Sequence, residues 1–282
     1  MSPIEPVDRT PVLDVRDLHV TFNTREGQVR AVDGVTFHVM PGEVLGVVGE
    51  SGSGKSVTTM SLLGLLAQVD VTGEALLSGR DLLKLDNEAL RHVRGNQIGF
   101  VFQDPMTALN PVLKVGVQLV EALGAHRKIP RQQARRRAEE LLAAVGIPDP
   151  RRRLDQYPVQ LSGGMRQRVM VALAIANSPD LIIADEPTTA LDVTIQAQVL
   201  ALLASLRQRE GAAVIIVTHD LGVIAEMADR VVVMYAGRIV EQCDVMELFD
   251  APAHHYTIGL LESRPQIGEV RKRLTGISGT AP

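Results

Sequence analysis

The stretch VLGVVGESGSGKS at residues 44–56 decides the fold of this 282-residue chain. Its first five residues form an apolar run without alternation, which is typical of a strand that is buried on both faces of a sheet. The remaining residues fit the pattern GxxxxGKS, a glycine-rich loop that opens a helix and binds phosphate. The other interpretation is a structural glycine-rich turn, but Lys-Ser at a buried strand-to-helix corner has no packing purpose.

The loop predicts a nucleotide site. Glycine lets successive backbone N–H groups point at phosphate oxygens, and the helix N-terminus adds positive dipole character. Lys55 supplies a positive charge for the β- and γ-phosphates, and the Ser56 hydroxyl is a ligand for Mg²⁺. We therefore expect ATP and Mg²⁺ as cofactors. The predicted nucleotide-binding residues of this segment are Gly49, Glu50, Ser51, Gly52, Ser53, Gly54, Lys55, Ser56 and Val57.

Further apolar runs alternate with helical patterns along the chain. The runs lie at residues 98–102, 181–184, 214–217 and 231–234. The helical patterns lie at residues 56–66, 131–145, 165–176 and 195–210. This alternation predicts an α/β fold in which helices cover a mainly parallel sheet, as in a P-loop NTPase (RecA-like) core.

Two segments depart from this alternation. Residues 12–15, 18–22 and 29–39 read as strands around a turn at residues 24–27, which predicts an antiparallel β subdomain at the N-terminus. Residues 105–161 have helix signals and few strand signals, which predicts an inserted α-helical subdomain. We expect one nucleotide-binding domain over residues 11–261 and a C-terminal tail over residues 262–282.

Composition limits the possible partners. The net charge is -4, only 3% of residues are aromatic, and the charges are well mixed, which argues against a nucleic-acid surface. Cys243 is the only cysteine, so no disulfide can form within one chain. No apolar run reaches the length of a membrane span, and the N-terminus does not resemble a signal peptide. If the protein acts at a membrane, we expect it to dock on another subunit at the cytoplasmic face.

Candidate catalytic groups follow three of the apolar runs. Asp185 and Glu186 end one run, and because adjacent strand residues point to opposite sides, they are expected to have different roles. Asp185 is the expected partner of Mg²⁺, and Glu186 the expected base for the water that attacks the γ-phosphate. His219 and Gln103 follow two other runs, at the sheet edge where α/β proteins bind ligands. Gln103 can reach either Mg²⁺ or the attacking water. Each group has an ordinary alternative: a solvated acidic pair at a strand end, a hydrogen-bonded histidine, or an uninvolved glutamine.

The pentapeptide LSGGM at residues 161–165 lies between the phosphate loop and the two carboxylates. With the Gln103, Ala190-Leu191-Asp192 and His219 motifs, this order resembles an ATP-binding cassette (ABC) ATPase over about residues 11–261. The resemblance implies that a serine and two glycines close on the γ-phosphate of ATP held by an opposite subunit. It also implies an interface residue, Asp192, and an aromatic ring against adenine, Phe22, although a strand Phe is as often a core residue. The matching serine and glycines are Ser162, Gly163 and Gly164.

A narrower resemblance points to oligopeptide and dipeptide importers. The segments at residues 103–111, 185–194, 233–238 and 255–257 are similar to that group, as is Met165, and residues 50–57 resemble the first of two unlike ATPase subunits. This implies an ATPase that powers import together with a related but different cassette, two transmembrane permease subunits and, indirectly, an extracytoplasmic solute-binding protein. The group includes nickel and glutathione importers, so the solute stays open. Relatives typically continue into a Cys- and Pro-rich extension, which is absent before Pro282, so we expect a short member or part of a longer polypeptide.

Two other functions fit the sequence less well. A soluble ABC ATPase of DNA repair or translation usually carries a long coiled-coil insert, zinc-binding cysteines or two cassettes in one chain, and this sequence has none of them. A nucleotide-binding regulator without hydrolysis predicts a degraded catalytic set, but Glu186, Gln103 and His219 are all present.

Overall fold

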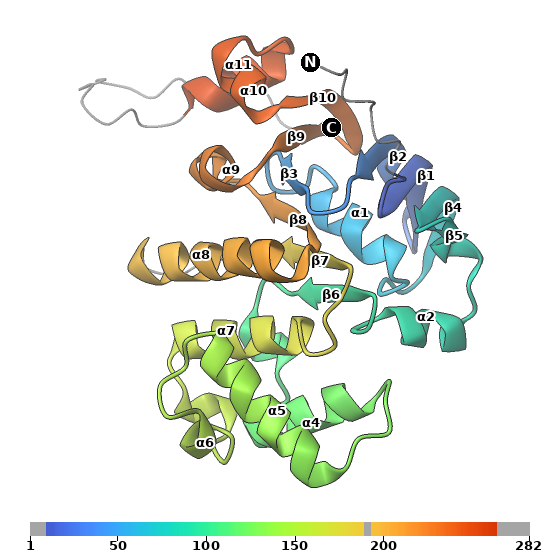
Figure 1. The fold of residues 1–282 in the computed structure, drawn as a ribbon. Helices are drawn as coiled ribbons and strands as arrows, with labels where there is room; N and C mark the ends of the chain where they lie inside the picture. The colour runs from blue at the N-terminus through green and yellow to red at the C-terminus, as the bar shows by residue number, and fades with distance from the viewer. Residues whose placement is uncertain (1–9, 189–192, 264–282) are drawn as a thin grey trace, which may run out of the picture.

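Two β-sheets form the centre of the structure, a computed structural model that describes residues 10–188 and 193–263 (Figure 1). The larger sheet has the strand order β10-β9-β3-β8-β7-β6. Strands β9, β3, β8, β7 and β6 are parallel, and only β10 runs antiparallel, beside β9. The bounds are β3 Val44–Val48, β6 Ile98–Val101, β7 Leu181–Asp185, β8 Ala213–Thr218, β9 Arg230–Tyr235 and β10 Arg238–Asp244. The predicted parallel sheet is therefore confirmed, with each of the five expected apolar runs forming one of its strands.

The smaller sheet is antiparallel, as expected for the N-terminal segment. It has the order β2-β1-β4-β5, with β1 Leu13–Thr24, β2 Gly27–Val39, β4 Val69–Leu77 and β5 Arg80–Asp81. The two short strands predicted before residue 24 are one strand, β1, whose register shifts between Val15 and Leu18. Strand β4 was not predicted, because its sequence VDVTGEALL alternates only weakly and contains a glycine and two acids.

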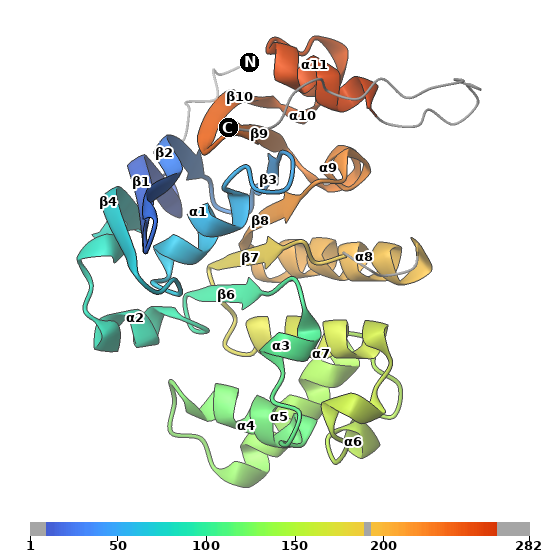
Figure 2. The same ribbon diagram turned by 180° about the vertical axis from the view of Figure 1, so that it is seen from behind.

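Helices cover the larger sheet, and a group of helices lies beyond one of its edges (Figures 1 and 2). Between β6 and β7 the described chain contains no strand, and its helices α4, α5, α6 and α7 gather beyond the β6 edge, while α10 and α11 lie near β9 and β10. The helices have the bounds α1 Lys55–Leu62, α2 Asn87–Val93, α3 Pro105–Ala108, α4 Val115–Gly124, α5 Arg131–Ala144, α6 Pro150–Arg153, α7 Gly163–Ala174, α8 Val193–Glu210, α9 Leu221–Met227, α10 Val245–Asp250 and α11 His255–Glu262. Short 3-10 helices lie at Leu82–Lys84 and Pro158–Gln160. Within the described residues, no helix is both long and apolar enough to span a bilayer.

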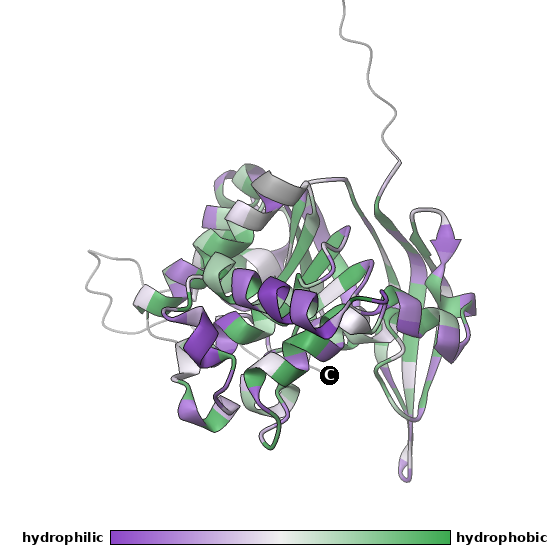
Figure 3. Ribbon diagram, turned by 60° about the horizontal axis from the view of Figure 1, so that its bottom comes forward, coloured by the Kyte–Doolittle hydropathy of each residue, from purple (hydrophilic) through white to green (hydrophobic). Residues whose placement is uncertain are grey.

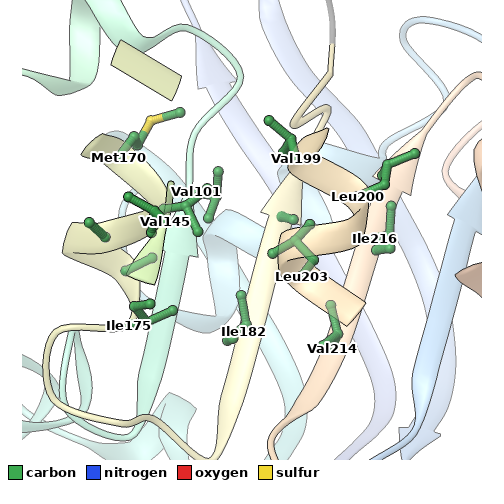
Figure 4. Packing of buried hydrophobic residues seen from close by; sticks show 14 of the residues in the cluster. Val101, Val145, Met170, Ile175, Ile182, Val199, Leu200, Leu203, Val214 and Ile216 are labelled. Atoms are coloured by element: carbon green, nitrogen blue, oxygen red, sulfur yellow. The ribbon is translucent and has the colours of Figure 1, made fainter. Parts of the chain in front are cut away.

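Alternate residues of the larger sheet face two separate cores. Leu45 and Val47 of β3 pack with α1 and the smaller sheet, while Val44 and Val48 face a second cluster formed with α7, α8 and α9. Figure 4 shows the second cluster, in which Leu203 of α8 lies over Ile182 and Val214. In Figure 3 the central strands are mostly hydrophobic, and the polar segments lie on the elements around them. A strand that serves two cores has no polar face, which explains its unbroken apolar run.

Gly99 of β6 allows the helical region to approach the sheet closely. A Cβ atom built there would lie 2.2 Å from the carbonyl oxygen of Ala174, the last residue of α7. Because that neighbour is backbone, it cannot turn aside. We expect Gly99→Ala to lower the free energy of unfolding by about 1–3 kcal/mol, as overpacking of a core does. Urea denaturation measures the change.

Gly124→Ala is the matched control for this prediction. Gly124 ends α4, and a Cβ atom there would meet no heavy atom within 4 Å. The same substitution should be neutral or stabilise by up to about 1 kcal/mol, because alanine favours the helix. Equal destabilisation by both variants would contradict the role assigned to the close contact at Gly99.

Candidate functional site

The loop at residues 49–54 joins β3 to α1 and contains three glycines with positive φ, of which Gly49 and Gly54 are also tightly packed. Gly49 has φ +151° and Gly54 has φ +97°. A Cβ atom at Gly49 would lie 2.2 Å from the carbonyl oxygen of Met234, and one at Gly54 would lie 2.6 Å from that of Ala31. Neither position accepts a side chain, so the loop depends on glycine for packing as well as for phosphate access.

The Lys55 side chain folds back onto this loop and bonds to its carbonyl oxygens. Its ammonium donates hydrogen bonds to the carbonyl oxygens of Gly49, at 2.8 Å, and Glu50, at 2.7 Å, and the residue is only 4% exposed. Burial lowers the pKa of the Lys55 ammonium, while the negative charges of Glu186, Asp185 and Glu50 act in the opposite direction. Lys55 begins α1, whose first backbone N–H groups, including that of Val57, have no acceptor within the helix. The arrangement suits an anion.

Ser56 and Asp185 meet from two different elements. The Ser56 hydroxyl, in the first turn of α1, donates a 2.8 Å hydrogen bond to Oδ1 of Asp185 at the end of β7. Asp185 is 1% exposed, and its Oδ2 atom is buried with no hydrogen-bond partner among the described residues. Burial raises the pKa of the Asp185 carboxyl, which the Ser56 hydrogen bond partly opposes. A buried carboxylate oxygen of this kind needs a cation.

This pair fits Mg²⁺. Within the described residues no group of three or more His, Cys, Asp or Glu side chains could hold a metal ion on its own. Mg²⁺ does not require such a group, since it is usually held by one or two carboxylates together with substrate phosphates. Ser56 and Asp185 supply a hydroxyl and a carboxylate beside the phosphate loop, so the residues fit an ion that is shared with a nucleotide.

Glu186 lies at the centre of a second group of side chains. Its Oε2 accepts a 3.0 Å hydrogen bond from the Gln103 amide, and its Oε1 lies 3.4 Å from Nδ1 of His219. The three predicted catalytic residues therefore come together from the ends of β6, β7 and β8. The amide nitrogen of Gln103 faces Glu186, so in this structure Gln103 is on the side of the predicted base.

The backbone of Glu186 is strained. Its φ is +46°, a left-handed conformation that is uncommon for residues other than glycine, and its N–H donates to the carbonyl oxygen of Val217 at 2.8 Å. Strained backbone of this kind concentrates at functional sites. The turn separates Glu186 from Asp185, so the two adjacent carboxylates have different partners, as expected.

The LSGGM segment begins α7. Ser162 is the N-cap of this helix, and its Oγ accepts a 3.3 Å hydrogen bond from the Met165 N–H. Ser162 and Gly163 are exposed. A Cβ atom at Gly164 would lie 2.7 Å from Ile195, whereas one at Gly163 would meet nothing within 4 Å. Packing within the chain thus explains the glycine at 164 but not the one at 163.

Three other predicted residues lie outside these groups. Phe22 is a partly buried residue of β1 that belongs to neither hydrophobic cluster, so it is not a core residue. Val57 packs its side chain against the cluster around α1, which leaves only its backbone for a nucleotide. Asp192 lies outside the described residues.

Sequence reasoning missed two residues that support the site. Gln167 of α7 is 2% exposed and donates a 2.7 Å hydrogen bond to the carbonyl oxygen of Pro187, just beyond Glu186. Tyr256 of α11 accepts a 2.8 Å hydrogen bond from the Glu50 N–H in the phosphate loop. A buried polar residue in an apolar helix is a visible signal for Gln167. For Tyr256 the sequence offers only its place in an importer-like motif.

A phosphate loop between a buried strand and a helix, facing carboxylates at the carboxyl edge of a parallel sheet, defines a P-loop nucleoside-triphosphatase. Residues 32–189 match the ABC transporter family, and the chain belongs to that family. Residues 240–282 match a second family, the oligopeptide/dipeptide transporter C-terminal region. Membership implies an ATPase subunit that binds ATP, with membrane permease and ATPase subunits as its general partners.

Several curated proteins are similar over nearly the whole chain. The chain is 54% identical to the probable peptide ABC transporter ATP-binding protein y4tR of Sinorhizobium fredii, over 96% of this chain and 82% of that protein. It is 52% identical to the oligopeptide transport ATP-binding protein OppD of Bacillus subtilis, over 97% of this chain and 77% of that protein. It is also 52% identical to the dipeptide transport ATP-binding protein DppD of the same organism, over 96% of this chain and 82% of that protein.

Solved structures have the same fold. The ATP-binding cassette MJ0796, dimeric in a post-hydrolysis state with ADP and phosphate, has a TM-score of 0.75 at 30% identity, over 83% of this chain and 98% of its own. The protein cbiO1 of Clostridium perfringens, part of an ABC transporter complex, has a TM-score of 0.72 at 29% identity, over 86% of this chain and 91% of its own. The predicted fold class and the predicted family are confirmed.

Proposed function

We propose that this chain hydrolyses ATP to power a peptide-type ABC importer, with residues 11–261 as the cassette, residues 105–161 as its helical subdomain and residues 262–282 as a tail. The observation that carries the proposal is the meeting of Gln103, Glu186 and His219 beside the Ser56–Asp185 pair. The names of the relatives support peptides as cargo, because OppD and DppD are an oligopeptide and a dipeptide transport protein.

The residues have distinct roles in hydrolysis. Backbone N–H groups of the loop and of the first turn of α1, apart from that of Glu50, which donates to Tyr256, bind the phosphates, and Lys55 exchanges its carbonyl partners for β- and γ-phosphate oxygens. Glu186 accepts a proton from water as the water oxygen bonds to the γ-phosphorus and the bond to the ADP oxygen breaks. Gln103 and His219 orient Glu186 and the attacking water. Phe22 stacks against adenine.

Ser56 and Asp185 would hold Mg²⁺ at this site, with Gln103 as a further candidate ligand through its amide oxygen. When bound, the ion neutralises charge on the phosphates. Asp185 supplies its unpartnered Oδ2 atom, and Ser56 fixes the other carboxylate oxygen. Glu186, the proposed base, has other partners than this pair, Gln103 and His219.

Replacement of Ser56 tests this assignment without an activity assay. Ser56→Ala should reduce the rise in melting temperature that Mg²⁺ produces in the presence of ATP, because a ligand stabilises in proportion to its affinity. Thermal denaturation at increasing Mg²⁺ measures the effect. Ser61→Ala is the control, since its hydroxyl bonds to the Thr58 carbonyl oxygen within α1. A Mg²⁺ response in Ser56→Ala equal to that of the unmodified protein would refute the role.

A second cassette completes the site. Ser162, Gly163 and Gly164 begin α7, and no hydrogen bond recorded for the described residues joins Ser162 to the phosphate loop of its own chain. We assign this segment, with Asp192, to the ATP that is held by an opposite cassette. The exposed glycine at 163, which packing does not require, supports this assignment. The resemblance of residues 50–57 to the first of two unlike ATPase subunits favours a related but different cassette as the partner.

The permease contact is assigned to the start of the helical subdomain. Residues 103–111 connect Gln103 of the site to this region, and Met106 and Val112 are 46% and 75% exposed. Apolar side chains exposed beside the site suit a partner surface. When two cassettes close around ATP, this segment would transmit the movement to two permease subunits at the cytoplasmic face of the membrane. A solute-binding protein would contribute indirectly.

Affinity purification from the native membrane, combined with uptake of labelled peptides, tests the proposed function. We expect this chain to recover two permease subunits and a second cassette, and peptide uptake to be lost when the Glu186→Gln variant replaces it. Recovery of ribosomes or DNA without permease would overturn the proposal in favour of a soluble ABC ATPase.

A further inference from the structure

We infer that Tyr256 is a positioning residue for the phosphate loop, through which the C-terminal region of this chain sets the affinity for ATP. The inference rests on the proposed function for the identity of the ligand. Its structural basis is the 2.8 Å hydrogen bond that the Glu50 N–H donates to the Tyr256 hydroxyl, across 206 positions of sequence.

The tyrosine is well fixed. Tyr256 is 7% exposed, and its ring packs on Tyr235 of β9 with a centroid separation of 4.6 Å and an interplanar angle of 42°. Burial raises the pKa of the Tyr256 hydroxyl, so it stays neutral. A buried aromatic ring of this kind has little freedom, and its hydroxyl therefore marks a fixed point for the Glu50 N–H.

Glu241 of β10 anchors the start of α11, where Tyr256 lies. Its carboxylate accepts hydrogen bonds from the backbone N–H groups of Ala253, at 2.8 Å, and His254, at 3.0 Å, and from the Thr257 hydroxyl. Burial alone would raise the pKa of the Glu241 carboxyl, but these hydrogen bonds lower it overall. One carboxylate thus holds both the segment before Tyr256 and the residue after it.

A second contact holds the other end of the phosphate loop. The Gly237 N–H, in the turn between β9 and β10, donates a 3.1 Å hydrogen bond to the Ser53 carbonyl oxygen. The loop is therefore held from outside at Glu50 and at Ser53, and both supports come from the last third of the chain. The N–H groups between these points are left for phosphate.

The supporting segment coincides with the second family match. Residues 240–282 match the oligopeptide/dipeptide transporter C-terminal region, and they include both Glu241 and Tyr256. The described part of this match is joined to the phosphate loop by the Tyr256 hydroxyl. A displacement of α11 would remove one of the two supports from the loop and weaken ATP binding without changing the catalytic residues.

The Tyr256→Phe variant tests the inference in the full-length chain. Loss of one hydrogen bond should raise the KM for ATP by about 2- to 10-fold, with kcat nearly unchanged. Without nucleotide, the Glu50 amide should exchange hydrogen faster by a similar factor. Tyr235→Phe is the control, because it keeps the ring pair and leaves the Glu50 contact intact. It should change neither quantity.

A double-mutant cycle separates positioning from general stability. Glu241→Gln should also raise the KM for ATP, and if Glu241 acts through Tyr256, the effects of Glu241→Gln and Tyr256→Phe should not add. An unchanged Glu50 exchange rate or an unchanged KM in Tyr256→Phe would overturn the inference, as would additive effects. The exchange measurement needs no ATP hydrolysis, so it distinguishes failure of this inference from failure of the proposed function.

Discussion

Glu186→Gln is expected to lower ATP turnover by roughly 10²-fold or more, as for the loss of a positioned general base. ATP binding should be kept, because the phosphate loop and Lys55 do not depend on the Glu186 side chain for their shape. Glutamine has nearly the same size and can still contact Gln103 and His219, so only the basic oxygen is lost. An ATP-bound dimer of cassettes should accumulate.

Steady-state phosphate release and size-exclusion chromatography with ATP measure these effects. Glu121→Gln, an exposed carboxylate on α4, is the control for charge removal and should hydrolyse ATP at the normal rate. Unchanged turnover in Glu186→Gln would refute the role assigned to this residue. Loss of ATP binding would show instead that the carboxylate shapes the binding site.

The second large effect is expected at Gly163, which we propose contacts the ATP of an opposite cassette. In the assembled cassettes, Gly163→Asp should lower hydrolysis of the ATP held by the opposite cassette by about 10²-fold or more, because a carboxylate facing the γ-phosphate of that site repels it by several kcal/mol. The isolated chain should fold normally and bind ATP at Lys55, since a Cβ atom at 163 enters open space.

The melting temperature of Gly163→Asp separates a loss of function from a loss of folding. Gly163 is the first residue of α7, where a negative charge stabilises the helix by about 0.3–1 kcal/mol. Gly163→Asp should therefore keep or raise the melting temperature while hydrolysis is lost. Gly164→Ala is the contrast, because its Cβ meets Ile195 within the chain and should lower the melting temperature. Normal hydrolysis at the opposite site in an assembly that contains Gly163→Asp would contradict the role in trans.

The central strands and the site residues at their ends could be predicted from the sequence for one physical reason. Each central strand serves two cores, so it appears as an unbroken apolar run, and parallel strands place their carboxyl ends at one edge. That is why Gln103, Glu186 and His219 could be expected to meet. Strand β10 was not predicted because it lies at the sheet edge and its residues are mostly partly exposed and polar.

Other contacts between distant segments could not be predicted from the sequence. Nothing in the pattern of the chain brings Tyr256 to Glu50, because the contact depends on how β9, β10 and α11 fold back on the sheet. The difference between Gly163 and Gly164 was equally invisible, since both follow Ser162 in one motif and only the position of Ile195 separates them. The sequence also does not show that the amide nitrogen of Gln103, and not its oxygen, faces Glu186.

The phosphate-loop helix and the LSGGM segment pack into different cores of the larger sheet. The helix after the phosphate loop packs through Leu62 into the cluster shared with the smaller sheet, whereas Leu161, just before Ser162, packs into the cluster shared with α8. Substitutions in the first cluster should therefore change the affinity of a cassette for its own nucleotide. Substitutions in the second cluster should change hydrolysis of the ATP that is held by the opposite cassette. We therefore expect repacking on opposite sides of the same strands to change affinity and cooperation separately.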